Sequence, residues 1–208
     1  MKIPEDGGMP TQSVTRSVTI NGLRARTGDH ICAFYRGREE RDRLVVPFLR
    51  EGVGAGDVCM CITGRRDHRR LERSVLDGCH GAEPGLLEMR DAEDTYLAGG
   101  SFSADRMLAN WRDWGEDVFG RRGKAFARSA SDMGWAQHVV TGPLIDDFMT
   151  YEAQATRYAR AYPLVALCLY DLDKFRGDVI IPALKAHPKV FFGGMLLENP
   201  YYVDPDEV

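Results

Sequence analysis

The chain contains 208 residues, and its 27 lysines and arginines against 31 aspartates and glutamates give a formal net charge of −4. A mildly acidic protein lacks the positive surface that non-specific binding to nucleic acid or to anionic membranes requires. Hydrophobic residues make up 44% and charged residues 28%, which is ordinary for a globular protein and excludes disordered, collagen-like and coiled-coil classes. The expected protein is cytoplasmic, with neither nucleic acid nor membrane as a direct partner.

Residues 1–22 are rich in Gly, Pro, Ser and Thr and contain no apolar segment of the kind found in secretory signals. We therefore expect 1–22 to be a poorly ordered N-terminal segment and 23–208 to form a single domain. The longest apolar run, Leu164 to Tyr170, is far shorter than the ~18 residues that a membrane-spanning helix needs. Five cysteines, most of them in apolar runs, indicate reduced and buried thiols.

Short apolar runs alternate with helical patterns from Ile31 onward. Runs typical of strands occupy 31–35, 58–63, 85–89, 124–130, 164–170 and 189–192. Apolar residues at helical spacing lie between them, and Thr141 to Pro143 are expected to open the longest of these helices. The alternation predicts an α/β fold with a doubly wound, mostly parallel sheet and helices on both faces. Ligands of such folds bind outside the carboxyl ends of the strands, so the residues that follow the strands are the first candidates for a site.

The segment after the first of these strands, Arg36 to Arg41, occupies the position of a phosphate-binding P-loop. A P-loop needs two glycines, a lysine and a hydroxyl side chain, and this segment offers only Gly37. Glu39 and Glu40 would repel phosphate. We therefore expect no nucleotide hydrolysis here, and Arg36 either holds an anion or begins a solvated helix.

Carboxylates and aromatic rings follow two other predicted strands. Asp132 and Trp135 come after one buried run, and Tyr170 and Asp171 stand at the end of the next. Side chains at these points face the crevice at the edge of a parallel sheet, so all four are candidates for ligand binding. The alternative for each aspartate is that it caps the turn or helix that follows.

Glu152 lies four residues beyond Phe148 and falls on or beside the apolar stripe of the long helix. A carboxylate on a buried face needs a charged or hydrogen-bonding partner, or it takes up a proton and its pKa rises. Either outcome places a polar group in an apolar interior, which a small-molecule pocket requires. The alternative is a salt bridge with an arginine such as Arg128.

Two pairs of metal-ligand residue types, His30 with Cys32 and Cys59 with Cys61, lie in two predicted strands. The alternation of side chains along a strand puts the members of each pair on one face. If the two strands were neighbours, one imidazole and three thiols would suit zinc or a redox sensor. Core packing is the simpler explanation, because free cysteine is among the most buried residue types, and we assign no metal or other cofactor. His187 stands next to a proline and is expected to end a helix.

Catalytic motifs are absent from the sequence. It contains no G-x-S-x-G elbow, no G-x-G-x-x-G loop after a strand and no H-E-x-x-H pair. We therefore predict a protein without enzymatic activity and assign no catalytic residue.

Six segments of the chain together carry a family resemblance, and they extend from about His30 to Val203. They read HICAFYRGREERDRLVVPFLREGVGAGDVCMCIT, SASDMGWA, TYEAQ, ALCLYDLDKF, AHPKVFFGG and ENPYYV. In this order they resemble the MEDS family, the sensory domains of methanogens, methylotrophs and many actinobacteria. The resemblance implies a RecA/KaiC-like fold with a degenerate P-loop and a regulatory role in sensing small hydrocarbon derivatives. The segments contain His30, Cys32, Asp132, Trp135, Glu152, Tyr170, Asp171 and His187.

The expected function is that of a sensory domain in transcriptional or signal-transduction control. It would bind a small organic ligand at the carboxyl ends of the strands and signal to a separate regulatory protein, such as a kinase or a transcription factor. Trp135 and Tyr170 would form aromatic walls, and Glu152, Asp132 and Asp171 would be polar anchors. The alternatives are a residual nucleotide-binding protein, a metal or redox sensor built on the cysteine and histidine pairs, and a pure interaction module. The sequence leaves open whether the chain forms a homodimer.

Overall fold

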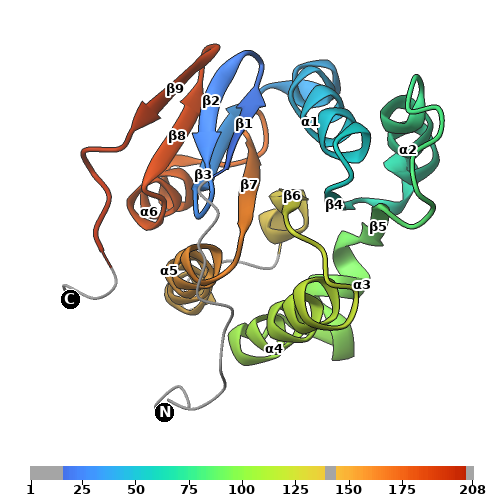
Figure 1. Ribbon diagram of the computed structural model, residues 1–208. Coiled ribbons are helices and arrows are strands. Elements are labelled where there is room, and N and C mark those ends of the chain that lie inside the picture. The colour runs from blue at the N-terminus through green and yellow to red at the C-terminus, as the bar shows by residue number, and fades with distance from the viewer. Residues whose placement is uncertain (1–15, 139–143, 205–208) are drawn as a thin grey trace.

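A seven-stranded sheet forms the centre of the protein (Figure 1). The computed structural model describes residues 16–138 and 144–204. The strand order is β5-β4-β6-β7-β3-β8-β9, and every pair is parallel except β8 with β9. The strands are β3 (His30–Tyr35), β4 (Val58–Thr63), β5 (Leu87–Asp91), β6 (Ala127–Asp132), β7 (Leu164–Asp171), β8 (Lys189–Phe192) and β9 (Met195–Glu198). The mostly parallel α/β fold expected from the sequence is confirmed.

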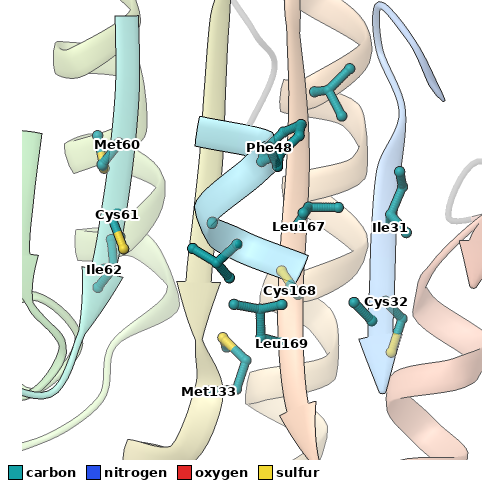
Figure 2. Close-up of a cluster of buried hydrophobic side chains, with 14 of the residues drawn as sticks. Ile31, Cys32, Phe48, Met60, Cys61, Ile62, Met133, Leu167, Cys168 and Leu169 are labelled. Carbon is teal, nitrogen blue, oxygen red and sulfur yellow. The ribbon is translucent and has the colours of Figure 1, made fainter. Parts of the chain in front are cut away.

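Helices cover both faces of this sheet. They are α1 (Gly37–Gly54), α2 (His68–Leu76), α3 (Ala92–Tyr96), α4 (Ala104–Gly115), α5 (Leu144–Ala161) and α6 (Gly177–Ala186), with a π-helical segment, Glu116–Arg121, after α4. α2 packs against α1, and α5 packs against both α4 and α6. Figure 2 shows α1, which carries Phe48, in front of β7, with other helices behind the sheet. No helix within residues 16–138 and 144–204 has both the length and the apolar character to cross a membrane.

β7 lies at the centre of the sheet because its apolar residues are covered from both faces. It pairs with β6 on one side and with β3 on the other. The register aligns Tyr35 with Asp171, and Asp132 with Leu169, so the carboxyl ends of the three strands meet at one edge. This is the edge where the sequence predicts a ligand site.

A hairpin of β1 (Ser17–Ile20) and β2 (Leu23–Arg26) corrects the expectation that all of 1–22 is poorly ordered. Asn21 and Gly22 have φ of 49° and 80°, and positive φ at both central residues is typical of a two-residue hairpin turn. The strands hold their place because Val18 and Ile20 are buried in the main core. Residues 1–15 lie outside the described residues, and so do residues 141–143, where we expected α5 to begin.

Candidate functional site

Four side chains able to ligate a metal ion or to hydrogen-bond a ligand meet in the interior, between the sheet and the helices α5 and α6. His30 begins β3, Cys168 lies in β7, Glu152 lies on α5, and His187 follows the last residue of α6. All four are buried, and Glu152 and His187 have no exposed surface (0% each). We call these four residues the buried cluster.

Local structure explains why these side chains face one another. Cys32 pairs with Cys168 across β3 and β7, and His30 lies two residues before Cys32, so all three project from the same face of the sheet. Figure 2 shows Cys32 and Cys168 on these two neighbouring strands. On α5, Glu152 and Thr156 are one turn apart on the buried face of the helix, and this face packs against β3 and β7.

The distances within the buried cluster are those of direct contact. His30 Nε2 lies 3.1 Å from Cys168 Sγ and 3.5 Å from Glu152 Oε2. Cys168 Sγ lies 3.5 Å from Glu152 Oε2, and His187 Nε2 lies 3.3 Å from this same oxygen. The other oxygen, Glu152 Oε1, accepts a hydrogen bond of 3.1 Å from the hydroxyl of Tyr170.

Hydrogen bonds outside the cluster hold the Nδ1 atom of each histidine. His187 Nδ1 donates to the carbonyl oxygen of Ala183 at 2.7 Å. Thr156 Oγ1 lies 2.9 Å from His30 Nδ1 and 3.2 Å from the carbonyl oxygen of Ala186. The Nε2 atoms of the two histidines therefore face Glu152 and Cys168.

Burial sets the protonation of the groups around Glu152. It lowers the pKa of His30 well below its ordinary value, and the neighbouring His187 lowers it further. Burial, with the Glu152 carboxylate as the second cause, raises the pKa values of Cys168 and Tyr170 well above their ordinary values. Without a bound cation, His30 is therefore neutral and Cys168 is a thiol at neutral pH.

A small cavity of ≈ 20 Å³ adjoins the buried cluster. Its lining contains His30 and Cys168, the aromatic residues Tyr96, Trp111 and Tyr151, and two serines, Ser129 and Ser131. A cavity must exceed about 10–15 Å³ to admit one water molecule, so this space accepts a molecule of about that size. The site is therefore a small space lined by aromatic and polar side chains.

The sequence matches the MEDS family, described as the methanogen/methylotroph, DcmR sensory domain, over residues 29–188. The chain belongs to this family. The transcriptional repressor DcmR of Methylorubrum extorquens is 26% identical to it over 206 residues, which cover 92% of this chain and 73% of the repressor. Membership of a family of sensory domains gives the chain a sensory or regulatory role.

Two solved structures show partial similarity to this MEDS domain. The flagellar accessory protein FlaH from Methanocaldococcus jannaschii has a TM-score of 0.44 at 11% identity, over 82% of this chain and 75% of that one. EssC (ATPases 2 and 3) from Geobacillus thermodenitrificans has a TM-score of 0.40 at 9% identity, over 99% of this chain and 44% of that one.

Asp132 lies at the carboxyl edge of the sheet in the MEDS domain, and protein groups already bind its carboxylate. Arg41 Nη1 donates to Asp132 Oδ2 at 2.8 Å, and the hydroxyl of Tyr35 and the backbone N–H of Gly134 donate to Oδ1 at 3.2 and 2.9 Å. Arg41 also binds Asp67 at 2.9 Å. A buried ion pair therefore closes this part of the edge. It does not include any residue of the buried cluster.

Asp171 caps the turn that follows β7, which is the alternative to ligand binding that the sequence analysis gave for this residue. Its Oδ1 accepts hydrogen bonds from the backbone N–H groups of Asp173 at 3.1 Å and of Gly37 at 3.4 Å. Arg36 forms an ion pair of 2.5 Å with Asp173, and both of these side chains are more than half exposed. The structure thus places Arg36 on the surface.

Trp135 belongs to an aromatic group, with its ring stacked on Tyr96 at 4.5 Å and on Phe102 at 5.5 Å. Tyr170 contacts Glu152 instead. The residues that line this cavity include neither Trp135 nor Tyr170, so the role of these two rings as the walls of a ligand site stays a prediction.

Two expectations about partners are wrong. β4 is separated from β3 by β6 and β7, so Cys59 and Cys61 do not meet His30 and Cys32. Arg128 does not pair with Glu152, because its guanidinium binds Asp57 and Glu51 on the other side of the sheet. Cys168 takes part in the site although the sequence did not single it out, since it lies in an unbroken apolar run where no alternation marks one face.

Proposed function

We propose that this MEDS domain is a non-enzymatic sensor whose cavity beside the buried cluster binds a small organic molecule. Binding changes a surface that a separate regulatory protein, such as a kinase or a transcription factor, recognises. The observation that carries the proposal is the cavity itself, whose lining combines His30 and Cys168 with the aromatic residues Tyr96, Trp111 and Tyr151. The transcriptional repressor among the relatives supports a role in regulation.

The size and the walls of the cavity indicate the class of ligand. A space of ≈ 20 Å³ admits one- or two-carbon molecules after small movements of side chains, and it is far too small for a nucleotide. Aromatic rings favour an apolar body, and the sulfur and the imidazole favour one weakly polar group. Short alcohols, aldehydes and halomethanes have this composition.

Nucleotide binding, the main alternative, has little support in the segment after β3. The side chain of Arg36 is turned to an exposed aspartate, and Arg41 is held by Asp132 and Asp67. A P-loop lysine is missing from the segment. ATP with magnesium therefore serves as the negative control in a ligand screen.

Thermal unfolding in the presence of methanol, acetaldehyde, a halomethane or ATP with magnesium tests the proposal. A ligand at 100 times its Kd stabilises by about 2.7 kcal/mol, which raises Tm by about 5–10 °C in a domain of this size. Ala155→Leu fills the cavity and removes this shift, whereas Ala161→Leu, on the exposed end of α5, keeps it. The proposal fails if no organic compound stabilises the protein, if ATP alone does, or if the variant with Leu at position 155 responds like the unmodified chain.

A further inference from the structure

The buried cluster brings four ligand atoms together in the interior. His187 Nδ1 donates to a carbonyl, so its Nε2 is the nitrogen that faces Glu152 Oε2, and His30 Nε2 and Cys168 Sγ lie beside the same oxygen. In the part of the chain that the structure describes, His187 Nε2 has no hydrogen-bond partner although it is fully buried. A buried polar atom without a partner is costly, and a bound cation would satisfy this nitrogen while contacting the other three ligand atoms.

The four ligand atoms lie close enough together for one metal ion to contact them all. All four lie within 4.8 Å of one another. Zinc–nitrogen and zinc–oxygen bonds near 2.1 Å and a zinc–sulfur bond near 2.3 Å give edges of about 3.3–3.6 Å in a tetrahedral site. The contacts from Glu152 Oε2 to His30, His187 and Cys168 are 3.5, 3.3 and 3.5 Å, so small adjustments suffice for an ion to enter.

The surroundings of the cluster have the form of the second layer of a metal site. Histidine ligands of metals donate their other N–H to a carbonyl, hydroxyl or carboxylate, which orients the ring. His187 does so to Ala183, and the Thr156 hydroxyl lies 2.9 Å from His30 Nδ1, where it can accept such a bond. Tyr170 similarly holds the oxygen of Glu152 that is turned away from the cluster.

We propose that His30 Nε2, His187 Nε2, Cys168 Sγ and Glu152 Oε2 bind a thiophilic divalent cation, with zinc as the best match. A thiolate and two imidazoles select zinc over magnesium or calcium, which prefer oxygen ligands. Binding breaks the S–H bond of Cys168, the sulfur keeps the electron pair to bind the metal, and the proton leaves to solvent. The site goes beyond the proposed function, because a cation can bind here whether or not an organic molecule fills the cavity.

Cobalt(II) is the probe, because its absorption reports directly on a bound thiolate. We expect metal-free protein to take up one equivalent of cobalt, with a thiolate-to-cobalt charge-transfer band, and zinc to displace it. Cys168→Ala loses the band and weakens zinc binding by about a hundredfold or more. Cys61→Ala is the matched control, since this cysteine is also buried but lies in β4, away from the cluster. This variant should keep both the charge-transfer band and the affinity for zinc.

A second variant guards against misfolding of the first. Glu152→Gln keeps the shape of the side chain, so it should retain the thiolate band while zinc binds about tenfold more weakly. The proposal is overturned if the unmodified protein shows no thiolate band, or if Cys61→Ala removes it as completely as Cys168→Ala. If organic ligands raise Tm but the protein shows no thiolate-to-cobalt band, the sensor proposal holds and the metal site is excluded. If the band appears but no organic ligand raises Tm, the metal site holds and the sensor proposal fails.

Discussion

The cysteine residues differ in what surrounds their sulfur atoms. Burial raises the pKa of Cys59 and of Cys61 to about 12, and it raises those of Cys32 and Cys168 well above the ordinary value. Cys79, between α2 and β5, is partly exposed. Because the thiolate is the reactive form, the raised pKa values and burial of the other four thiols make them slow to react, whereas Cys79 is accessible to reagents.

This difference predicts that only one cysteine of the folded chain, Cys79, reacts rapidly with an alkylating reagent. At pH 8, a thiol with a pKa of about 12 is ionised in only about one molecule in ten thousand, so iodoacetamide should modify Cys79 alone within minutes. In urea all five cysteines should react, which serves as the control for reagent and stoichiometry. Peptide mass spectrometry locates the label, and rapid modification of Cys59 or Cys61 in the folded protein would favour the redox-sensor alternative.

For Glu152, the sequence predicted the burial of the side chain but not its partners. Its spacing from Phe148 predicted a buried carboxylate, and its exposed fraction is 0%. Its partners could not be predicted, because His30 and His187 come from opposite ends of the chain and meet only through the order of β7, β3 and β8 in the sheet. Arg128 was a plausible partner on charge alone, but its strand position turns it toward α1 and Asp57.

At the level of elements, α1 lies close to the sheet at one glycine. A Cβ atom on Gly52 would approach Cys59 Sγ to 2.5 Å and Arg128 Cδ to 2.8 Å. The arginine cannot move aside cheaply, because Asp57 and the carbonyl oxygen of Phe48 each bind its guanidinium at 2.9 Å. The close contact between α1 and the sheet therefore requires glycine, which has no side chain, at position 52.

Gly52→Ala should lower the free energy of unfolding although alanine is the better helix former. Overpacking costs about 1–3 kcal/mol, against a gain of about 1 kcal/mol in helix propensity, which leaves a net loss of up to about 2 kcal/mol. Gly54→Ala is the control in the same helix, since its Cβ would meet nothing within 4 Å, and it should be neutral or stabilise by about 0.5 kcal/mol. Urea denaturation measures both, and equal effects of the two substitutions would contradict a close contact at position 52.

The hairpin of β1 and β2 was predictable from the sequence and was missed. Asn-Gly between two short alternating segments is the strongest local signal for a two-residue hairpin, but the composition of 1–22 as a whole pointed to disorder. The β9 strand had no such signal, since it is an antiparallel edge strand with mostly exposed residues. Local turn chemistry thus carried information that average composition concealed.

At the scale of the whole molecule, the alternation of elements predicted the fold class but not the order of strands. The order decides which candidates meet: β3 lies between β7 and β8, which brings His30 to Cys168 and His187. The same order keeps the cysteines of β4 two strands away. Strand order follows from the packing of all helices at once, so a motif read along the chain cannot supply it.

His187 connects the buried cluster to one edge of the molecule. It ends α6 and leads through one proline to β8 and then to β9, the last strand of the sheet. Large apolar side chains are exposed there, including Phe192 (50%), Met195 (53%) and Leu197 (47%). A short segment of the chain therefore connects the buried cluster to an exposed apolar surface.

Hydrogen–deuterium exchange with and without zinc should show this connection. A cation that fixes His187 restrains the end of α6 and the start of β8, so amide exchange in 177–198 should slow by about tenfold or more. β5 forms the opposite edge of the sheet and takes no part in the cluster, so 65–91 provides an internal control whose exchange should not change. His187→Ala should remove the slowing at 177–198. Equal slowing at both edges would mean that zinc stabilises the domain as a whole, and the edge formed by β8 and β9 would then have no special connection to the cluster.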